Sequence, residues 1–173
     1  MVLCLTGFSC VGKTSVSKLL MEKYNYKLIS VRNVSHELAM KNGYSRTREW
    51  LIDTTVAEYL KRCREEILSM VNDNISTNIV IDDLFDIELW NDIAKNYESL
   101  LINLCIDEKT RINRMCIRES FVSVSMGHEE LRFLDGWKIN FGIKDVISLA
   151  SNSIDVSDMT IAEIAQEIMS ITH

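Results

Sequence analysis

Residues 7–14 read Gly7-Phe8-Ser9-Cys10-Val11-Gly12-Lys13-Thr14. The spacing fits G-x-x-x-x-G-K-[ST], the pattern of a phosphate-binding loop. The apolar run 2–5 before it predicts a buried strand, and 15–23 after it predicts an amphipathic helix. A chance match to the pattern is the alternative, and the position of the motif between a strand and such a helix argues against it.

A strand, a glycine-containing loop and a helix in this order form an anion-binding site. The first turn of a helix has unpaired N–H groups and a partial positive charge, and glycines let the backbone close around a phosphate. We expect Lys13 to reach the β- and γ-phosphates of a nucleoside triphosphate and Thr14 to ligate Mg²⁺. The predicted nucleotide-binding residues are Gly7, Phe8, Ser9, Cys10, Val11, Gly12, Lys13, Thr14 and Ser15.

Length, charge and cysteine usage narrow the class of protein. The chain has 173 residues without proline or an evident linker, which predicts one domain over 1–173. Its net charge of −6 disfavours wrapping of nucleic acid but leaves a local basic groove open. An odd number of cysteines, five, without C-x-x-C or a signal peptide predicts reduced thiols in the cytoplasm. No apolar run approaches the ~20 residues that span a bilayer, so we expect no membrane segment.

Strand and helix patterns alternate along the rest of the chain. Further strands are predicted at 27–31, 78–83, 100–106 and 153–156. Helices are predicted at 33–41, 47–71, 86–96, 108–118, 128–140, 143–150 and 161–171. Asn33, Thr47 and Asp107 are the predicted N-caps of the first, second and fourth of these helices. The segment 121–127 is predicted to be a mobile flap. This order predicts a five-stranded parallel sheet with helices on both faces, which binds ligands beyond the carboxyl ends of its strands.

Asp82 and Asp83 end the strand predicted at 78–83. A buried strand that delivers a carboxylate to its carboxyl end places it near the phosphate loop, where it can organise Mg²⁺. The alternative is that these residues simply open the following turn. We favour a metal-shell or acceptor-site role for at least one of them.

Arg111, Arg114 and Arg118 fall at steps of three and four, so they share one face of a predicted helix. Three like charges on one face repel one another unless an anion joins them, and the planar guanidinium suits phosphate oxygens. A phosphate-binding role is therefore favoured, with a solvated surface as the alternative.

With these features, nearly the whole chain resembles the small P-loop kinases of the nucleoside monophosphate kinase type. The phosphate loop is shared with many other nucleotide-binding proteins, and the layout around it is more specific. The residues that carry this likeness are the strand and turn 28–34, the stretch Thr47-Arg48-Glu49-Trp50-Leu51, the strand 79–83, the three arginines and the closing strand and helix from 154. Departures are Asp83 where the family has glycine, and Leu84-Phe85 where an arginine often stands.

The resemblance implies a three-layer α/β P-loop fold with acceptor-binding helices at about 32–72 and a short lid at about 111–128. It implies phosphoryl transfer from ATP, with Mg²⁺, to a small nucleotide acceptor. Arg32, Arg48, Asp82 and Asp83 would bind the acceptor, and Asp82 would also hold the metal through water. Lys13, Arg114, Arg118 and Arg111 would act on the transferred group.

Three other functions remain open from the sequence. A kinase of a hydroxymethylated base in DNA would need a basic groove beside the lid, against the acidic net charge. A GTPase-like switch would need a guanine motif such as Asn-Lys-x-Asp at a strand end, which the sequence does not supply. A nucleotide-binding protein without catalysis is disfavoured by the intact Gly12-Lys13-Thr14. The identity of the acceptor and the oligomeric state stay open.

Overall fold

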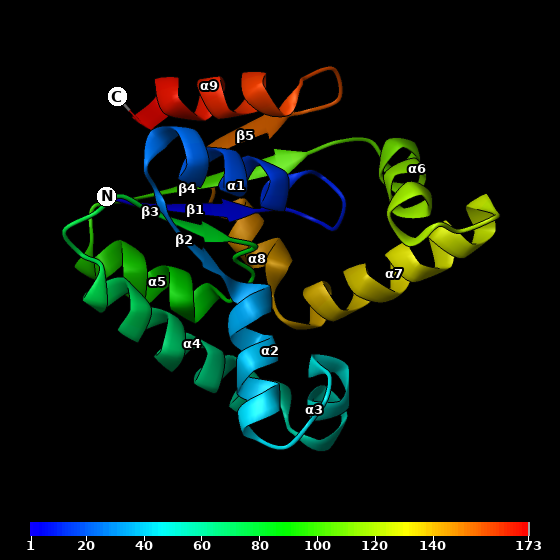
Figure 1. Cartoon of the computed structure of the whole chain (residues 1–173), viewed down its shortest axis with the longest axis horizontal. Coiled ribbons are helices and arrows are strands. Elements are labelled where there is room, and N and C mark those ends of the chain that lie inside the picture. Colours follow the sequence, from blue (N-terminus) through cyan, green and yellow to red (C-terminus); the bar gives the residue numbers. More distant parts are fainter. Residues whose placement is uncertain (173) are drawn as a thin grey trace.

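A parallel five-stranded sheet forms the centre of the molecule, which the computed structural model describes over residues 1–172 (Figure 1). The strands stand in the order β2-β3-β1-β4-β5, and every neighbouring pair is parallel. Their bounds are β1 Val2–Thr6, β2 Lys27–Ser30, β3 Ile79–Asp82, β4 Ser99–Cys105 and β5 Asn152–Asp155. The sheet architecture that the sequence predicts is thus confirmed.

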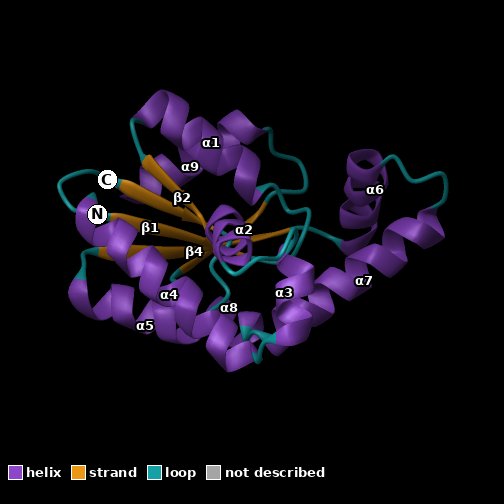
Figure 2. Cartoon of the chain, turned by 60° about the horizontal axis from the view of Figure 1, so that its bottom comes forward, coloured by secondary structure: helices purple, strands orange, loops and turns teal. Residues whose placement is uncertain are grey.

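Helices connect the strands and cover both faces of the sheet. Their bounds are α1 Lys13–Tyr24, α2 Val31–Lys41, α3 Thr47–Asp53, α4 Val56–Asp73, α5 Ile87–Asn96, α6 Glu108–Glu119, α7 Val124–Asn140, α8 Ile143–Ser148 and α9 Ile161–Thr172. α1 and α9 lie on one face, whereas α4, α5 and α8 lie on the other (Figure 1). The α2–α3 segment extends away from the sheet in Figure 1, and the α6–α7 segment extends away from it in Figure 2.

Two apolar cores follow from the alternation of side chains along the strands. Leu3 and Leu5 of β1 are fully buried against α1 and α9. Cys4, between them, points to the opposite face and is buried with residues of α2, α4, α5 and α8. The central position of β1, buried on both sides, fixes the place of the loop that follows it.

Some helix boundaries differ from the sequence-based prediction. α2 begins at Val31, and its cap is Ser30, whose Oγ accepts a hydrogen bond from the Asn33 backbone N–H at 3.4 Å. The single helix predicted from Thr47 is two helices, because the chain is extended at Thr54 and Thr55. Thr55 caps the second helix by accepting from the Glu58 N–H at 3.2 Å, an alternative to helical hydrogen bonding that threonine readily offers.

The predicted flap at 121–127 is mostly helix. Ser123 caps α7 by accepting a hydrogen bond from the Met126 N–H at 3.3 Å, so that only a short turn separates α6 from α7. Gly127 lies close against α6, since a Cβ there would collide with the Cys116 sulfur. The α6–α7 pair is therefore a packed helical hairpin. Within residues 1–172, no helix is long and apolar enough to cross a membrane.

Candidate active site

The predicted phosphate loop connects β1 to α1. Gly7 and Gly12 have φ of 129° and 106°, a region that favours glycine. A Cβ on Gly7 would collide with the carbonyl oxygen of Leu104 in β4. Gly12 precedes α1 without a side-chain cap, so the N–H groups of the first turn keep their capacity to bind an anion.

Lys13 is buried at the centre of this loop. Its Nζ donates to the carbonyl oxygens of Gly7 at 2.6 Å and Phe8 at 2.7 Å, and lies 3.2 Å from Asp83 Oδ1. Burial lowers the pKa of Lys13 to about 8, and the carboxylate of Asp83 limits this fall. The ammonium group is thus held within the loop by acceptors that orient it.

The two aspartates at the end of β3 have different surroundings. Asp82 pairs in register with Leu5 of β1, so it lies beside the strand that begins the loop. Asp83 adopts a left-handed conformation, with φ of 72°, which Asp tolerates better than most residues. This explains physically why a glycine suits the position in the family that the chain resembles.

Asp83 is the anion between two lysines. Its Oδ1 accepts from Lys138 Nζ at 2.5 Å as well as from Lys13. Burial by itself would raise the pKa of Asp83, but the two ammonium groups outweigh it and lower that pKa to about 2. The side chain is therefore an ionised carboxylate at neutral pH.

Asp82 fits the role of a Mg²⁺-organising carboxylate. It is 2% exposed, and its Oδ1 has no hydrogen-bond partner among the described residues. Burial and the charge of Asp83 raise the pKa of Asp82, against a hydrogen bond from Thr14. Mg²⁺ prefers oxygen ligands and keeps several waters, so the Thr14 hydroxyl and a water held by Asp82 suit it when nucleotide phosphates supply the other ligands. Among residues 1–172, no group of three or more His, Cys, Asp or Glu is placed to hold a metal by itself.

Two of the three predicted lid arginines reach the phosphate loop from α6. Arg111 donates through Nε to the Ser9 carbonyl oxygen at 2.9 Å, and its guanidinium lies 5.2 Å from the Phe8 ring centroid. Arg114 donates through Nη1 to the Cys10 carbonyl oxygen at 3.3 Å. Their side chains thus lie over the loop, as a lid role requires.

Arg118 is placed differently. It is exposed near the end of α6, where it pairs with Glu119 at 2.7 Å and donates to the Met115 sulfur at 3.2 Å. Its contacts are therefore with its own helix.

The predicted acceptor-binding arginines lie on α2 and α3. Arg32 is exposed in the first turn of α2. Arg48 is exposed on α3, with its guanidinium carbon 4.0 Å from the ring centroid of Phe133 on α7. The predicted acceptor region and α7 therefore meet through a cation–π contact.

Three residues of α7 escaped the sequence analysis. Lys138 contacts Asp83, Asp135 forms an ion pair with Arg111, and Phe133 stacks with Arg48. The signal for two of them was present, because Leu131, Asp135 and Lys138 recur at steps of four and three on a predicted helix. The sequence does not show that this face turns toward the phosphate loop.

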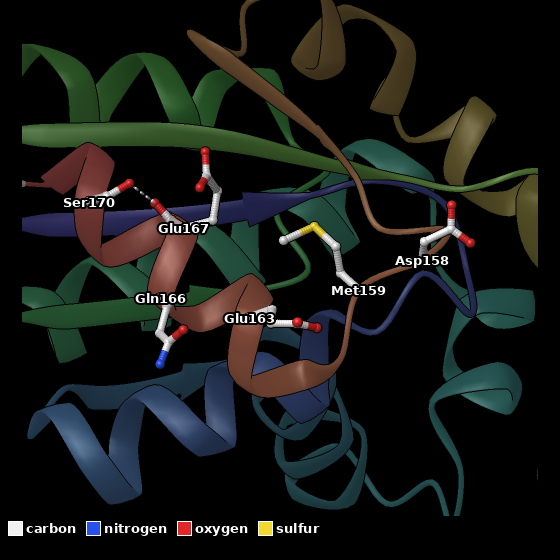
Figure 3. A pocket seen from close by; sticks show the side chains of 6 residues that line it. All are labelled: Asp158, Met159, Glu163, Gln166, Glu167 and Ser170. Atoms are coloured by element: carbon white, nitrogen blue, oxygen red, sulfur yellow. Dashed lines mark hydrogen bonds between the residues drawn. The ribbon is translucent and has the colours of Figure 1, made fainter.

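A cavity of about 380 Å³ lies elsewhere, along α9 and the segment before it (Figure 3). Its lining residues are Asp158, Met159, Glu163, Gln166, Glu167 and Ser170. Three carboxylates and no cation among them make this wall unfavourable for phosphates. The phosphate loop, β3 and α6 contribute nothing to it, so it is separate from the site described above.

Comparisons with known proteins connect this geometry to a class. No protein-family model matches the chain. The chain is similar to an S-adenosylmethionine-dependent nucleotide dehydratase from Lacinutrix mariniflava. The two sequences are 24% identical over an alignment of 179 residues, which covers 95% of this chain and 34% of that protein. The chain therefore spans about a third of the length of this curated relative.

Solved structures share the whole architecture. An uncharacterized protein from Eubacterium ventriosum matches with a TM-score of 0.71 at 15% identity, over 99% of this chain and 97% of that one. Shikimate kinase from Aquifex aeolicus matches with a TM-score of 0.63 at 19% identity, over 99% and 96% of the two chains. Dephospho-CoA kinase from Campylobacter jejuni matches with a TM-score of 0.54 at 13% identity, over 99% and 94%. The chain thus has the three-layer α/β fold of the P-loop kinases.

Proposed function

We propose that the protein is an ATP- and Mg²⁺-dependent phosphotransferase that moves the γ-phosphoryl of ATP to a small nucleotide acceptor, namely a nucleoside or deoxynucleoside monophosphate. The observation that carries this proposal is the convergence of cations from distant segments on one loop. Lys13 contacts the carbonyl of Gly7, and Arg111 and Arg114 of α6 contact the carbonyls of Ser9 and Cys10. Such clustering suits a polyphosphate.

The chemistry needs positioning and charge neutralisation more than covalent help. The backbone around Gly12 and Lys13 would hold the β- and γ-phosphates, and Thr14 with Asp82 would hold the Mg²⁺ that neutralises them. Arg114 and Arg111 would cover the transferred group and exclude water, which otherwise competes as an acceptor. Arg118 would join them only if the end of α6 moves.

Two observations support a nucleotide as the acceptor. The curated relative at 24% identity is named for chemistry on a nucleotide. In addition, Asp83 is held by two lysines, which makes this carboxylate a poor base for deprotonating a hydroxyl acceptor. A phosphate monoester is already an anion at neutral pH and needs no such base. Arg32 and Arg48 would bind its phosphate and base.

A coupled assay of ADP release tests the proposal. Mg-ATP is offered with nucleoside and deoxynucleoside monophosphates, and separately with dephospho-CoA, shikimate, gluconate and hydroxymethylated DNA. We expect release that depends on one class of monophosphate and is lost in Lys13→Ala. ADP release that depends on shikimate, gluconate or DNA would show that the acceptor is not a nucleoside monophosphate. ATP binding without turnover on any acceptor would overturn the proposal.

A further inference from the structure

Lys138 of α7 reaches the start of the phosphate loop. Its Nζ lies 2.5 Å from Asp83 Oδ1 and 3.3 Å from the carbonyl oxygen of Gly7. Lys13 contacts the same two oxygens, at 3.2 Å and 2.6 Å. Two lysines that lie 125 positions apart in the sequence thus share one pair of acceptors at the start of the loop.

The two ammonium groups share the carboxylate of Asp83, and both lysine side chains are nearly buried, at 6% and 11% exposure. Asp82 also acts electrostatically on both lysines, but within residues 1–172 it forms an ion pair with neither. The proximity of Lys138 contributes to lowering the pKa of Lys13, after the larger effect of burial. Buried like charges in such proximity are costly unless a further anion joins them.

A purely structural role for Lys138 would be to tie α7 to β3. One carboxylate and one ammonium group suffice for such a tie, and a partner away from the loop would avoid repulsion with Lys13. Instead, Asp83 is held in a left-handed conformation, with φ of 72°, that directs its carboxylate to both lysines. Backbone conformations of this kind persist where the surroundings enforce them, and they cluster at functional sites.

We propose that Lys138 is a catalytic residue that contacts the transferring γ-phosphoryl group together with Lys13, and that Asp83 is the positioning residue for both. This inference rests on the proposed phosphotransferase function and deepens it. A phosphoryl group in transit carries charge on three equatorial oxygens. Lys13 and Lys138 would meet it from the side of β3, and Arg114 from the side of α6.

The step is balanced without a proton moving through Lys138. An oxygen of the acceptor phosphate forms the new bond to the γ-phosphorus, and the β–γ bridging oxygen leaves with ADP. Lys138 stays an ammonium group and donates hydrogen bonds throughout. Its contribution is electrostatic, because it is present before the reaction and need not reorganise.

The first test compares Lys138→Met, which keeps the length of the side chain and removes the charge, with Lys138→Arg, which restores a cation. Lys144→Met on α8 is the matched control, because Lys144 is exposed. We expect kcat to fall at least tenfold in Lys138→Met, partial recovery in Lys138→Arg and no change in Lys144→Met. A kcat within twofold of the wild type in Lys138→Met, whatever its thermal stability, would overturn the proposal.

A binding measurement separates this inference from the proposed function, because it needs no acceptor. The dissociation constants of ADP and of an ATP analogue with a non-hydrolysable β–γ bridge are measured by calorimetry. In Lys138→Met we expect the analogue to bind at least tenfold more weakly and ADP to change less than twofold. Equal changes for both ligands would show that Lys138 does not contact the γ-phosphate, even if the wild type proves to be a kinase.

Asp83→Asn tests the positioning role. We expect it to lower kcat more than it raises the KM of either substrate, since it releases both ammonium groups. In the double variant with Lys138→Met, the two losses should not add, because one residue acts through the other. If the fold-loss in kcat of the double variant equals the product of the two single losses, Asp83 and Lys138 act independently, and the positioning role of Asp83 is contradicted.

Discussion

The guanidinium carbon of Arg48 lies 4.0 Å from the ring centroid of Phe133, so that α3 touches α7. Behind this contact, ring pairs join α7 to α4 and α3. The successive centroid distances are 6.1 Å for Phe133–Trp137, 5.7 Å for Trp137–Phe141, 5.3 Å for Phe141–Tyr59 and 5.2 Å for Tyr59–Trp50. Because α7 also supplies Lys138, the predicted acceptor region and the phosphate site are joined through one packed element.

Replacement of Arg48 is expected to affect the acceptor rather than ATP. In Arg48→Ala we expect the acceptor KM to rise roughly tenfold, because a charged hydrogen bond is typically worth about 1.5–3 kcal/mol, with kcat and the KM for ATP changed less than threefold. Steady-state kinetics with both substrates varied checks this. Arg46→Ala is the control, since Arg46 is also exposed. Equal changes in the acceptor KM for the two replacements would show that Arg48 does not bind the acceptor.

Lys13→Ala is expected to lower kcat/KM by about a hundredfold or more. It removes a buried ammonium group from the point where negative charge develops, and losses of this size are typical for such groups. Lys18→Ala, on the exposed face of the same helix, is expected to retain activity. Thermal unfolding of both variants separates catalysis from folding. Full activity in Lys13→Ala would contradict the assignment of residues 7–14 as the phosphate-binding loop.

Arg111 is expected to contribute to stability as well as to catalysis. It forms an ion pair with Asp135 Oδ2, and both side chains are mostly buried, whereas Asp135 Oδ1 has no hydrogen-bond partner among the described residues. Removing one member of such a pair leaves an uncompensated charge, which costs about 3–5 kcal/mol. Arg111→Ala and Asp135→Ala should therefore each lower the free energy of unfolding by an amount of that order.

Urea unfolding of the single and double variants measures this coupling. The double variant should be scarcely less stable than either single one, because the second replacement removes the stranded charge. Arg132→Ala, at an exposed position of α7, serves as the control. Additive losses in the double variant would mean that Arg111 and Asp135 are not coupled.

The parts of this fold that local chemistry determines were predictable from the sequence. The strand before the loop, the glycines at 7 and 12 and the apolar strand ending at Asp82 are short-range signals, and they predict the parallel sheet correctly. The sequence analysis misses the break at Thr54–Thr55, because an apolar stripe continues across it and the capping by Thr55 competes with the helix only in the folded chain.

The cations around the loop were partly predictable. Arg111 and Arg114 share a helix face whose spacing predicts a joint role. Lys138 shares helical spacing with Asp135, but this spacing does not reveal its partner, because Asp83 lies 55 positions earlier and the pairing depends on how α7 returns to the sheet. The choice between Arg114 and Arg118 likewise depends on where α6 ends relative to the loop. Contacts of this kind are set by packing and not by periodicity.

The last prediction concerns acid stability. The pKa of Asp83 is lowered to about 2, because Lys13 and Lys138 outweigh the effect of burial. A carboxylate with a depressed folded-state pKa stabilises the protein above its unfolded pKa of about 3.9, and this contribution disappears as the pH falls through about 2. Asp83→Asn keeps a residue that tolerates the left-handed conformation, so the replacement mainly removes charge.

We therefore expect Asp83→Asn to be less stable than the wild type by on the order of 2 kcal/mol at pH 6, and the difference to shrink toward zero near pH 2. Urea unfolding of the two proteins at a series of pH values, without nucleotide, measures it. Asp73→Asn, at an exposed position near the end of α4, is the control and should follow the wild type throughout. A gap between Asp83→Asn and the wild type that stays constant from pH 6 to pH 2 would contradict the ionised carboxylate between the two lysines.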